Sequence, residues 1–127
     1  MAHRLFSQPG TKCFQLHGHS WWVELELTGA VRDDGMIVNF DTVKSVWRKY
    51  LDETFDHHTV VSDADPLMGC NIEGVQGLPF DPTVENMAML WGCWALNRFG
   101  QEYGYYVKVW EASTNAATWR STNVEVE

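Results

Sequence analysis

The sequence lacks three features that would place it in other classes of protein. No apolar run approaches the roughly 20 residues of a membrane span, and no apolar signal region follows the first residues. The acidic balance, a formal net charge of −8, provides no basic face for general nucleic-acid binding. The three cysteines include no C-x-x-C pair, so we expect no disulfide framework and a reducing, cytoplasmic location.

What the sequence does contain is ordinary for a globular protein. Its 127 residues are 45% hydrophobic and 20% charged, which is enough for one buried core but not for two. We therefore expect a single domain over residues 1–127. Seven tryptophans, a high number for this length, predict large buried aromatic surfaces in the core or at interfaces.

Alternation of apolar and polar side chains predicts the strands. It is clearest where Val23, Leu25 and Leu27 share one face. The strands predicted in this way cover residues 3–6, 17–28, 36–40, 105–111 and 119–126, with a break at 115–117. Asp33-Asp34-Gly35 is a turn signal that would make residues 17–40 a hairpin.

Apolar spacings of three and four predict two helices. The first covers residues 41–54 with Asp41 as its N-cap, and the second begins near Pro82 and stops before Gly100, with Cys93 on its core face. Between them, residues 56–82 form an irregular loop, and a loop of such length is often functional. This order of elements predicts an α+β domain, an antiparallel sheet with two helices on one face.

The segment Cys13-Phe14-Gln15-Leu16-His17-Gly18-His19 carries the clearest chemical signal. Histidines at i and i+2 of a strand project from the same face and can reach one metal ion. Catalytic zinc sites use three protein ligands and leave a fourth position open, and His3 is placed to complete the set. The alternative is that the histidines are ordinary strand residues and Cys13 a small core hydrophobe.

Two further groups suit proton transfer and binding. Asp56 beside His57 can orient an imidazole that works near neutral pH, although the pair could also belong to a polar surface loop. Glu111 shares a predicted strand face with Val107 and Val109, so it should point inward, where a carboxylate needs a partner. A ring with two adjacent N–H donors, such as a pterin, would be one. The alternative is a strand-end glutamate in water.

Taken in order, these motifs resemble one family. They are His3-Arg4-Leu5, Cys13-x-x-x-His17-Gly18-His19, Gly35-Met36-Ile37-Val38-Asn39-Phe40, Asp56-His57, Pro82-Thr83-Val84-Glu85-Asn86 and Glu111. The set resembles the 6-pyruvoyltetrahydropterin synthase family over nearly the whole chain. The three-residue gap after Cys13 is similar to the 6-carboxytetrahydropterin synthase branch.

The resemblance implies a tunnelling fold (T-fold), a four-stranded antiparallel sheet with two helices on one face. Subunits of this fold join into barrels, so a homohexamer is expected. Carried over by position, the resemblance implies zinc ligands at His3, His17 and His19, a base at Cys13, a relay at Asp56 and His57, a pterin anchor at Glu111 and a pocket residue at Glu85.

The implied reaction converts 7,8-dihydroneopterin triphosphate and water to 6-carboxy-5,6,7,8-tetrahydropterin, acetaldehyde and triphosphate, in queuosine biosynthesis. Zinc would polarise oxygens of the substrate and acidify neighbouring C–H bonds. Pyruvoyl synthase activity and a non-catalytic protein that binds zinc or pterins are the alternatives. Only Met1 and Ala2 precede His3, so a shortened first strand is expected, and residues 112–117 lack the cysteines that some relatives carry.

Overall fold

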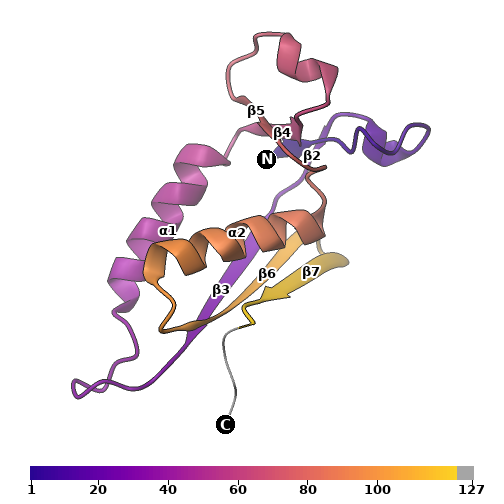
Figure 1. Ribbon diagram of the computed structural model, residues 1–127. Helices are drawn as coiled ribbons and strands as arrows, with labels where there is room; N and C mark the ends of the chain where they lie inside the picture. The colour runs from indigo at the N-terminus through magenta and orange to yellow at the C-terminus, as the bar shows by residue number, and fades with distance from the viewer. Residues whose placement is uncertain (123–127) are drawn as a thin grey trace.

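The computed structural model describes residues 1–122, which form two helices and two β-sheets (Figure 1). The helices are α1 (Phe40–Thr54) and α2 (Val84–Phe99), and the strands are β1 (Ala2–His3), β2 (His17–Gly18), β3 (Trp22–Thr28), β4 (Thr59–Ser62), β5 (Val75–Leu78), β6 (Gly104–Ala112) and β7 (Asn115–Arg120). Short 3-10 turns lie at η1 (Lys12–Phe14) and η2 (Pro66–Gly69). The α+β class is confirmed. No helix in this part of the chain has the length and apolar character needed to cross a membrane.

The sheet with the longer strands, called the larger sheet below, is antiparallel and has the strand order β3-β6-β7. Its register places Val23 opposite Val109 and Val107 opposite Trp119. Exposure alternates along β3 because successive side chains of a strand point to opposite faces. One face is therefore apolar and contributes to the core, while Glu24 and other polar side chains lie on the opposite face.

Both helices lie on the apolar side of this sheet (Figure 1). Aromatic rings join them, since Tyr50 of α1 stacks on Trp94 of α2 with ring centroids 3.8 Å apart. Gly92 lets α2 approach β7 closely, because a Cβ at that position would lie 2.1 Å from the ring of Trp119. The core thus fixes how α2 lies on the sheet, and the N-terminal end of this helix, capped by Thr83, supports the site described below.

The smaller sheet has the order β2-β1-β4-β5 and lies beyond one end of the larger sheet (Figure 1). β1 pairs antiparallel with β2 and parallel with β4, which in turn pairs parallel with β5. This pairing sets His3 directly opposite His17. It also shows that the stretch 56–82, predicted to be irregular, contains two strands.

The predicted strand over residues 36–40 is wrong. Hydrogen bonds from Arg32 N–H and Gly35 N–H close a turn, the first to Met36 O at 2.8 Å, and Gly35 has a φ of 80°. The side chain of Asn39 then accepts a hydrogen bond from Thr42 N–H at 3.2 Å and caps α1. Asn39, and not the predicted Asp41, is the N-cap, because its short side chain satisfies an otherwise unpaired backbone donor.

Other predicted strand boundaries also change. The stretch 17–28 is divided between β2 and β3, because the chain passes from the smaller sheet to the larger one at residues 19–21. β7 begins at Asn115, inside the predicted break, and residues 123–126 of the predicted last strand lie outside the described residues. Within residues 1–122 the antiparallel sheet has three strands where four were expected. The reason is that 36–40 does not pair and β1 belongs to the smaller sheet.

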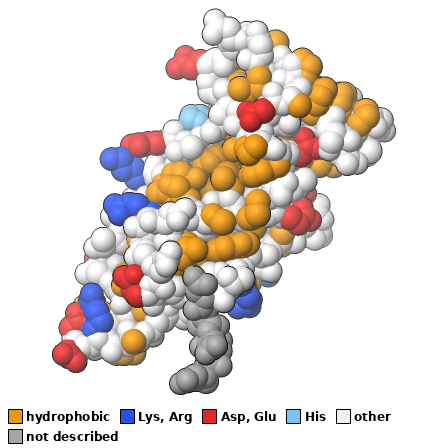
Figure 2. Space-filling view, in the orientation of Figure 1, with side chains coloured by type: hydrophobic (Ala, Val, Ile, Leu, Met, Phe, Trp, Pro, Cys, Tyr) orange, Lys and Arg blue, Asp and Glu red, His pale blue; other side chains and the backbone are white. Residues whose placement is uncertain are grey.

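The face of α2 that Cys93 occupies is not the core face. Cys93 is exposed, as is its neighbour in the helical spacing, Met89, at 38%. Figure 2 shows hydrophobic side chains across the middle of this side of the molecule, over α2. The helix is apolar on more than one side, so its periodicity could not separate the core face from the outer face.

Candidate active site

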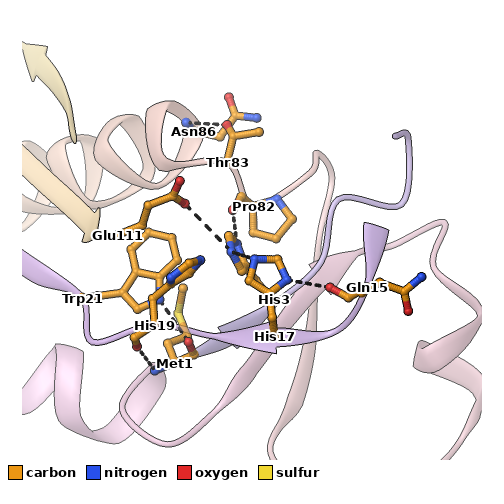
Figure 3. Close-up of polar contacts among 10 residues, drawn as sticks. All are labelled: Met1, His3, Gln15, His17, His19, Trp21, Pro82, Thr83, Asn86 and Glu111. Carbon is orange, nitrogen blue, oxygen red and sulfur yellow. Dashed lines mark hydrogen bonds and ion pairs between the residues drawn. The ribbon is translucent and has the colours of Figure 1, made fainter. Parts of the chain in front are cut away.

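Three histidines from separate positions of the chain form one cluster (Figure 3). His3, His17 and His19 each offer a ring nitrogen, and these atoms lie within 4.8 Å of one another. The Nε2 atoms of His3 and His17 are 3.1 Å apart. His3 is almost fully buried, at 2% exposure, and the other two are half-buried. The structure therefore brings together all three of the metal ligands predicted from the sequence.

Backbone carbonyls fix the orientation of two of these rings. His3 Nδ1 donates a hydrogen bond to Pro82 O at 2.7 Å, and His17 Nδ1 donates to Gln15 O at 2.6 Å. A carbonyl oxygen can only accept, so each Nδ1 carries a proton, and in the neutral ring each Nε2 then presents a lone pair. Partners of this kind typically orient metal-binding histidines.

The facing lone pairs provide a test of whether a metal fits. Two acceptor nitrogens at 3.1 Å have no proton to share between them in this tautomer, so a cation is needed to offset their repulsion. A tetrahedral zinc with Zn–N bonds of about 2.0–2.1 Å places its ligand nitrogens about 3.3 Å apart. The donor set, its tautomers and its spacing therefore fit a zinc ion.

The charge state of His3 points the same way. Burial, with smaller contributions from the neighbouring His17 and His19, lowers the pKa of His3 to about 4, although the hydrogen bond to Pro82 O opposes this shift. The ring is therefore neutral near pH 7. Metal binding requires a neutral imidazole, so His3 can act as a ligand without first losing a proton.

Trp21 completes the wall of the cluster, and the sequence analysis did not identify it. Its ring lies edge-on to His3, with centroids 5.0 Å apart, and its Nε1 donates to Met1 O at 3.0 Å. The i, i+2 spacing that pairs His17 with His19 continues to residue 21, and this was the available signal. The carbonyl of Pro82 carried no comparable signal.

Glu111 lies beside the cluster at a break in the β6–β7 ladder. The register shifts between Trp110 and Ala112, which leaves Glu111 as the extra residue of a β-bulge. Bulges often re-aim a side chain next to an active site. The Oε2 atom of Glu111 is 3.9 Å from His3 Nε2, and its side chain is 20% exposed. It lines a pocket of about 660 Å³ together with His19.

Asp56 and His57 follow α1 and reach the cluster from another side. They line a pocket of about 530 Å³ that also includes His19 and Trp21. His57 Nδ1 lies 3.1 Å from Asp56 Oδ1, and the two side chains are 92% and 59% exposed. His57 has a φ of 61°, a left-handed conformation that is uncommon for a residue with a side chain.

Cys13 lies apart from both of these pockets. It is exposed, in the turn η1, and lines a third pocket of about 560 Å³ with Ser7, Asp81 and Asn86. None of the three histidines lines that pocket. Among the described residues, the structure therefore does not place the Cys13 thiol next to the Asp56–His57 pair.

Glu85 is exposed in the first turn of α2 and lines none of these three pockets. Its neighbours in the Pro82–Asn86 motif have a structural role. Thr83 caps the helix by accepting from Asn86 N–H at 3.1 Å, and the Asn86 side chain donates to Asp81 O at 2.8 Å. The motif thereby fixes the Pro82 carbonyl that orients His3.

Comparison with known proteins gives consistent matches. The model of the family described as 6-pyruvoyl tetrahydropterin synthase matches residues 1–122. The 6-carboxy-5,6,7,8-tetrahydropterin synthase of Rickettsia felis is 35% identical over 93 residues, which is 68% of this chain and 67% of the relative. The 6-pyruvoyl tetrahydrobiopterin synthase of Dictyostelium discoideum is 26% identical over 130 residues, which is 94% of this chain and 87% of the relative.

Solved structures agree on the fold. The 6-pyruvoyl tetrahydropterin synthase of Plasmodium falciparum superimposes with a TM-score of 0.75 at 21% identity, covering 94% of this chain and 88% of that one. An uncharacterized protein from Wolinella succinogenes superimposes with a TM-score of 0.79 at 20% identity, covering 94% and 91%. Likeness at this identity shows the fold alone, and it confirms the T-fold that the sequence motifs implied.

Proposed function

The chain belongs to the 6-pyruvoyl tetrahydropterin synthase family, and we propose that it is the zinc-dependent 6-carboxytetrahydropterin synthase of that family. Its substrates would be 7,8-dihydroneopterin triphosphate and water, and its products 6-carboxy-5,6,7,8-tetrahydropterin, acetaldehyde and triphosphate. The observation that carries the proposal is the histidine cluster, in which two Nε2 lone pairs face each other at 3.1 Å. The carboxytetrahydropterin synthases named among its relatives support the choice of branch.

His3, His17 and His19 would hold the zinc ion. When bound, zinc supplies a positive charge that polarises oxygens of the substrate side chain and acidifies the neighbouring C–H bonds. The chain's own contribution is to keep His3 neutral by burial and to orient it through Pro82 O. Trp21 packs edge-on against His3 and His19 and would form one wall of the metal site.

Cys13 would remove the proton from the substrate carbon, since a thiolate near a cation is a good base at neutral pH. Asp56 would orient His57, which would return a proton elsewhere on the substrate; the 3.1 Å contact between them supports this pairing. Glu111 would accept the two adjacent N–H donors of the pterin, and Glu85 would lie at the approach to that pocket.

The separation of Cys13 from the Asp56–His57 pair bears on assembly. They line different pockets of one chain, which supports a site that a second copy of the chain would complete. We therefore place the activity in an oligomer, with a homohexamer as the expected form. Light scattering at micromolar concentration tests this, and a monomeric mass would contradict it.

The decisive experiment is incubation of the zinc-loaded protein with dihydroneopterin triphosphate, followed by mass analysis of the products. The 6-carboxy product together with acetaldehyde supports the proposal. Cys13→Ala should keep its zinc and lose about 10²–10⁴-fold in turnover, as removal of a general base does. Cys70→Ala is the matched control, because that thiol is also exposed but lies in the loop after η2.

Pyruvoyl synthase activity is the second candidate, favoured by the Dictyostelium discoideum relative that matches 94% of this chain. The two candidates share the substrate and differ in the product, so the same mass analysis separates them. If the product is 6-carboxytetrahydropterin, we place the protein in queuosine biosynthesis. We place it in the cytoplasm, where three free, exposed thiols stay reduced.

A further inference from the structure

The segment 5–14, which joins β1 to β2, is a largely exposed loop that carries Cys13. Its helical turn, η1, begins after Thr11, which makes no capping hydrogen bond through its side chain. A general base must stay within hydrogen-bond reach of the proton that it removes. A loop of this kind does not supply that precision itself, so the support must come from residues around it.

One support is an ion pair at the start of the loop. Arg4 Nε donates to Asp65 Oδ2 and Arg4 Nη2 donates to Asp65 Oδ1, each at 2.5 Å. The Asp65 side chain is fully buried and Arg4 is 21% exposed. The hydrogen bond from Arg4 lowers the pKa of Asp65, so the carboxylate stays charged. Asp65 Oδ1 also accepts from Leu67 N–H at 2.8 Å, which ties the pair to η2.

The same guanidinium touches both ends of the loop. Its carbon lies 5.6 Å from the ring centroid of Phe6 and 5.3 Å from that of Phe14. The two rings stack on each other with centroids 5.8 Å apart. Cation–π contacts of this kind favour one placement of the rings. Phe14 directly follows Cys13, so the position of its ring constrains the thiol.

Two further hydrogen bonds hold the loop closed. Leu5 N–H donates to Cys13 O at 2.8 Å, and Ser7 N–H donates to Asp81 Oδ2 at 3.1 Å. Asp81 directly precedes Pro82, whose carbonyl orients His3. The loop is therefore tied to the same piece of backbone that supports the histidine cluster.

We propose that Arg4 and Asp65 are positioning residues whose ion pair, with Phe6 and Phe14 against the guanidinium, fixes Cys13 relative to the histidine cluster. This inference rests on the proposed role of Cys13 as the base. The planar guanidinium is required because it matches a carboxylate at two points and still presents its faces to aromatic rings. A buried Asp65 without Arg4 would be an unpaired buried charge, so the ion pair forms whenever this part of the chain is folded.

The test compares Asp65→Asn with Asp34→Asn, each in a background in which Cys70 and Cys93 are serine. Asp34 is the matched control because it forms a similar pair with Arg32 at an exposed turn, 51% exposed on each side. Asp65→Asn should lower kcat about 10–100-fold, the effect of misplacing a catalytic group by about 1 Å. We expect KM and zinc content to stay close to those of Asp34→Asn. Alkylation of Cys13 by iodoacetamide should change severalfold.

Two more variants separate positioning from stability. Phe14→Leu removes a ring without leaving a buried charge, and Arg4→Lys keeps the charge but loses the two-point contact. Both should lower kcat in the zinc-loaded, folded fraction, by less than Asp65→Asn does. Fluorescence melting and metal analysis define that fraction.

Either of two results would overturn the inference. One is wild-type kcat and wild-type Cys13 alkylation in folded Asp65→Asn. The other is a loss that follows only the amount of folded, zinc-loaded protein in all three variants. If the unmodified protein turns over no pterin, the proposed function fails instead, and alkylation alone then decides. Equal alkylation rates in Asp65→Asn and Asp34→Asn would reject the positioning role.

Discussion

The histidine cluster and the Asp56–His57 pair meet at one pocket, yet they are built in opposite ways. His3 is buried, and carbonyls at 2.6–2.7 Å orient its ring and that of His17. His57 is 92% exposed, and its Nδ1 lies 3.1 Å from Oδ1 of the adjacent Asp56. The cluster is held by backbone contacts around a buried His3, whereas the pair extends into solvent from the end of a helix.

This difference follows from what each group has to do. A metal site works when its ligands are neutral and already in place, which burial and fixed tautomers provide. The proposed proton relay has to reach a bound substrate, and an exposed pair at the end of a helix can do so. The left-handed φ of 61° at His57 supports the proposed role, because residues in sparsely populated backbone conformations cluster at active sites.

The largest effect is expected when a ligand is removed from the histidine cluster. His17→Ala leaves two imidazoles, and we expect zinc affinity to fall by more than the roughly 10–100-fold typical of losing a supporting partner. Turnover should fall to background. His58→Ala is the control, since its ring hydrogen-bonds Thr54 O and lies outside the cluster. Metal analysis after dialysis and a turnover assay measure both variants. Full zinc occupancy in His17→Ala would refute the ligand set.

At the exposed pair, we expect two variants of His57 that differ in stability but lose activity to the same extent. His57→Gly removes the cost of a left-handed residue and should stabilise the protein by about 1 kcal/mol relative to His57→Ala. Both variants should keep zinc and lose about 10²–10⁴-fold in turnover, because the relay is gone. Urea unfolding and turnover on the same samples provide the measurement. A glycine variant no more stable than the alanine variant would show that the backbone of His57 is not strained.

The sequence pattern identified the histidine cluster well and its supports poorly. An i, i+2 pair of histidines is a local signal, and the strand periodicity of residues 22–28 survived in β3. The carbonyl of Pro82 acts on His3 from 79 positions away, and no local pattern predicts such a contact. The sequence could not predict the parallel pairing of β1 with β4 either, because both strands are too short to show periodicity.

The exposed pair shows the converse limit. Asp56 and His57 were identified by type and adjacency, but their exposure and distance from Cys13 depend on the fold. The same holds for Glu111, whose predicted inward direction relied on regular alternation, while the structure places it at a bulge that alters the register. Alternation predicts a strand's faces only as far as its ladder stays regular.

The third predicted effect is a pH dependence of the metal-free protein that comes from the buried member of the cluster. Burial lowers the pKa of His3 from 6.5 to about 4 in the folded chain. Between these values the unfolded chain binds a proton at His3 that the folded chain does not. The free energy of unfolding should therefore fall as pH drops from about 6.5 towards 4, by at most about 3 kcal/mol. Above pH 6.5 this residue contributes no slope.

The measurement is urea unfolding of chelator-treated protein at pH 7 and pH 5, a range chosen to stay above the titration of most carboxyl groups. His3→Gln should remove part of the slope, since glutamine has no proton to gain and can still donate to Pro82 O. His57→Gln is the control, because it makes the same substitution at a histidine that is 92% exposed. Equal slopes in wild type and His3→Gln would mean that His3 of the metal-free protein titrates like an exposed histidine. The contrast between a buried His3 and the solvated pair would then not extend to the metal-free protein.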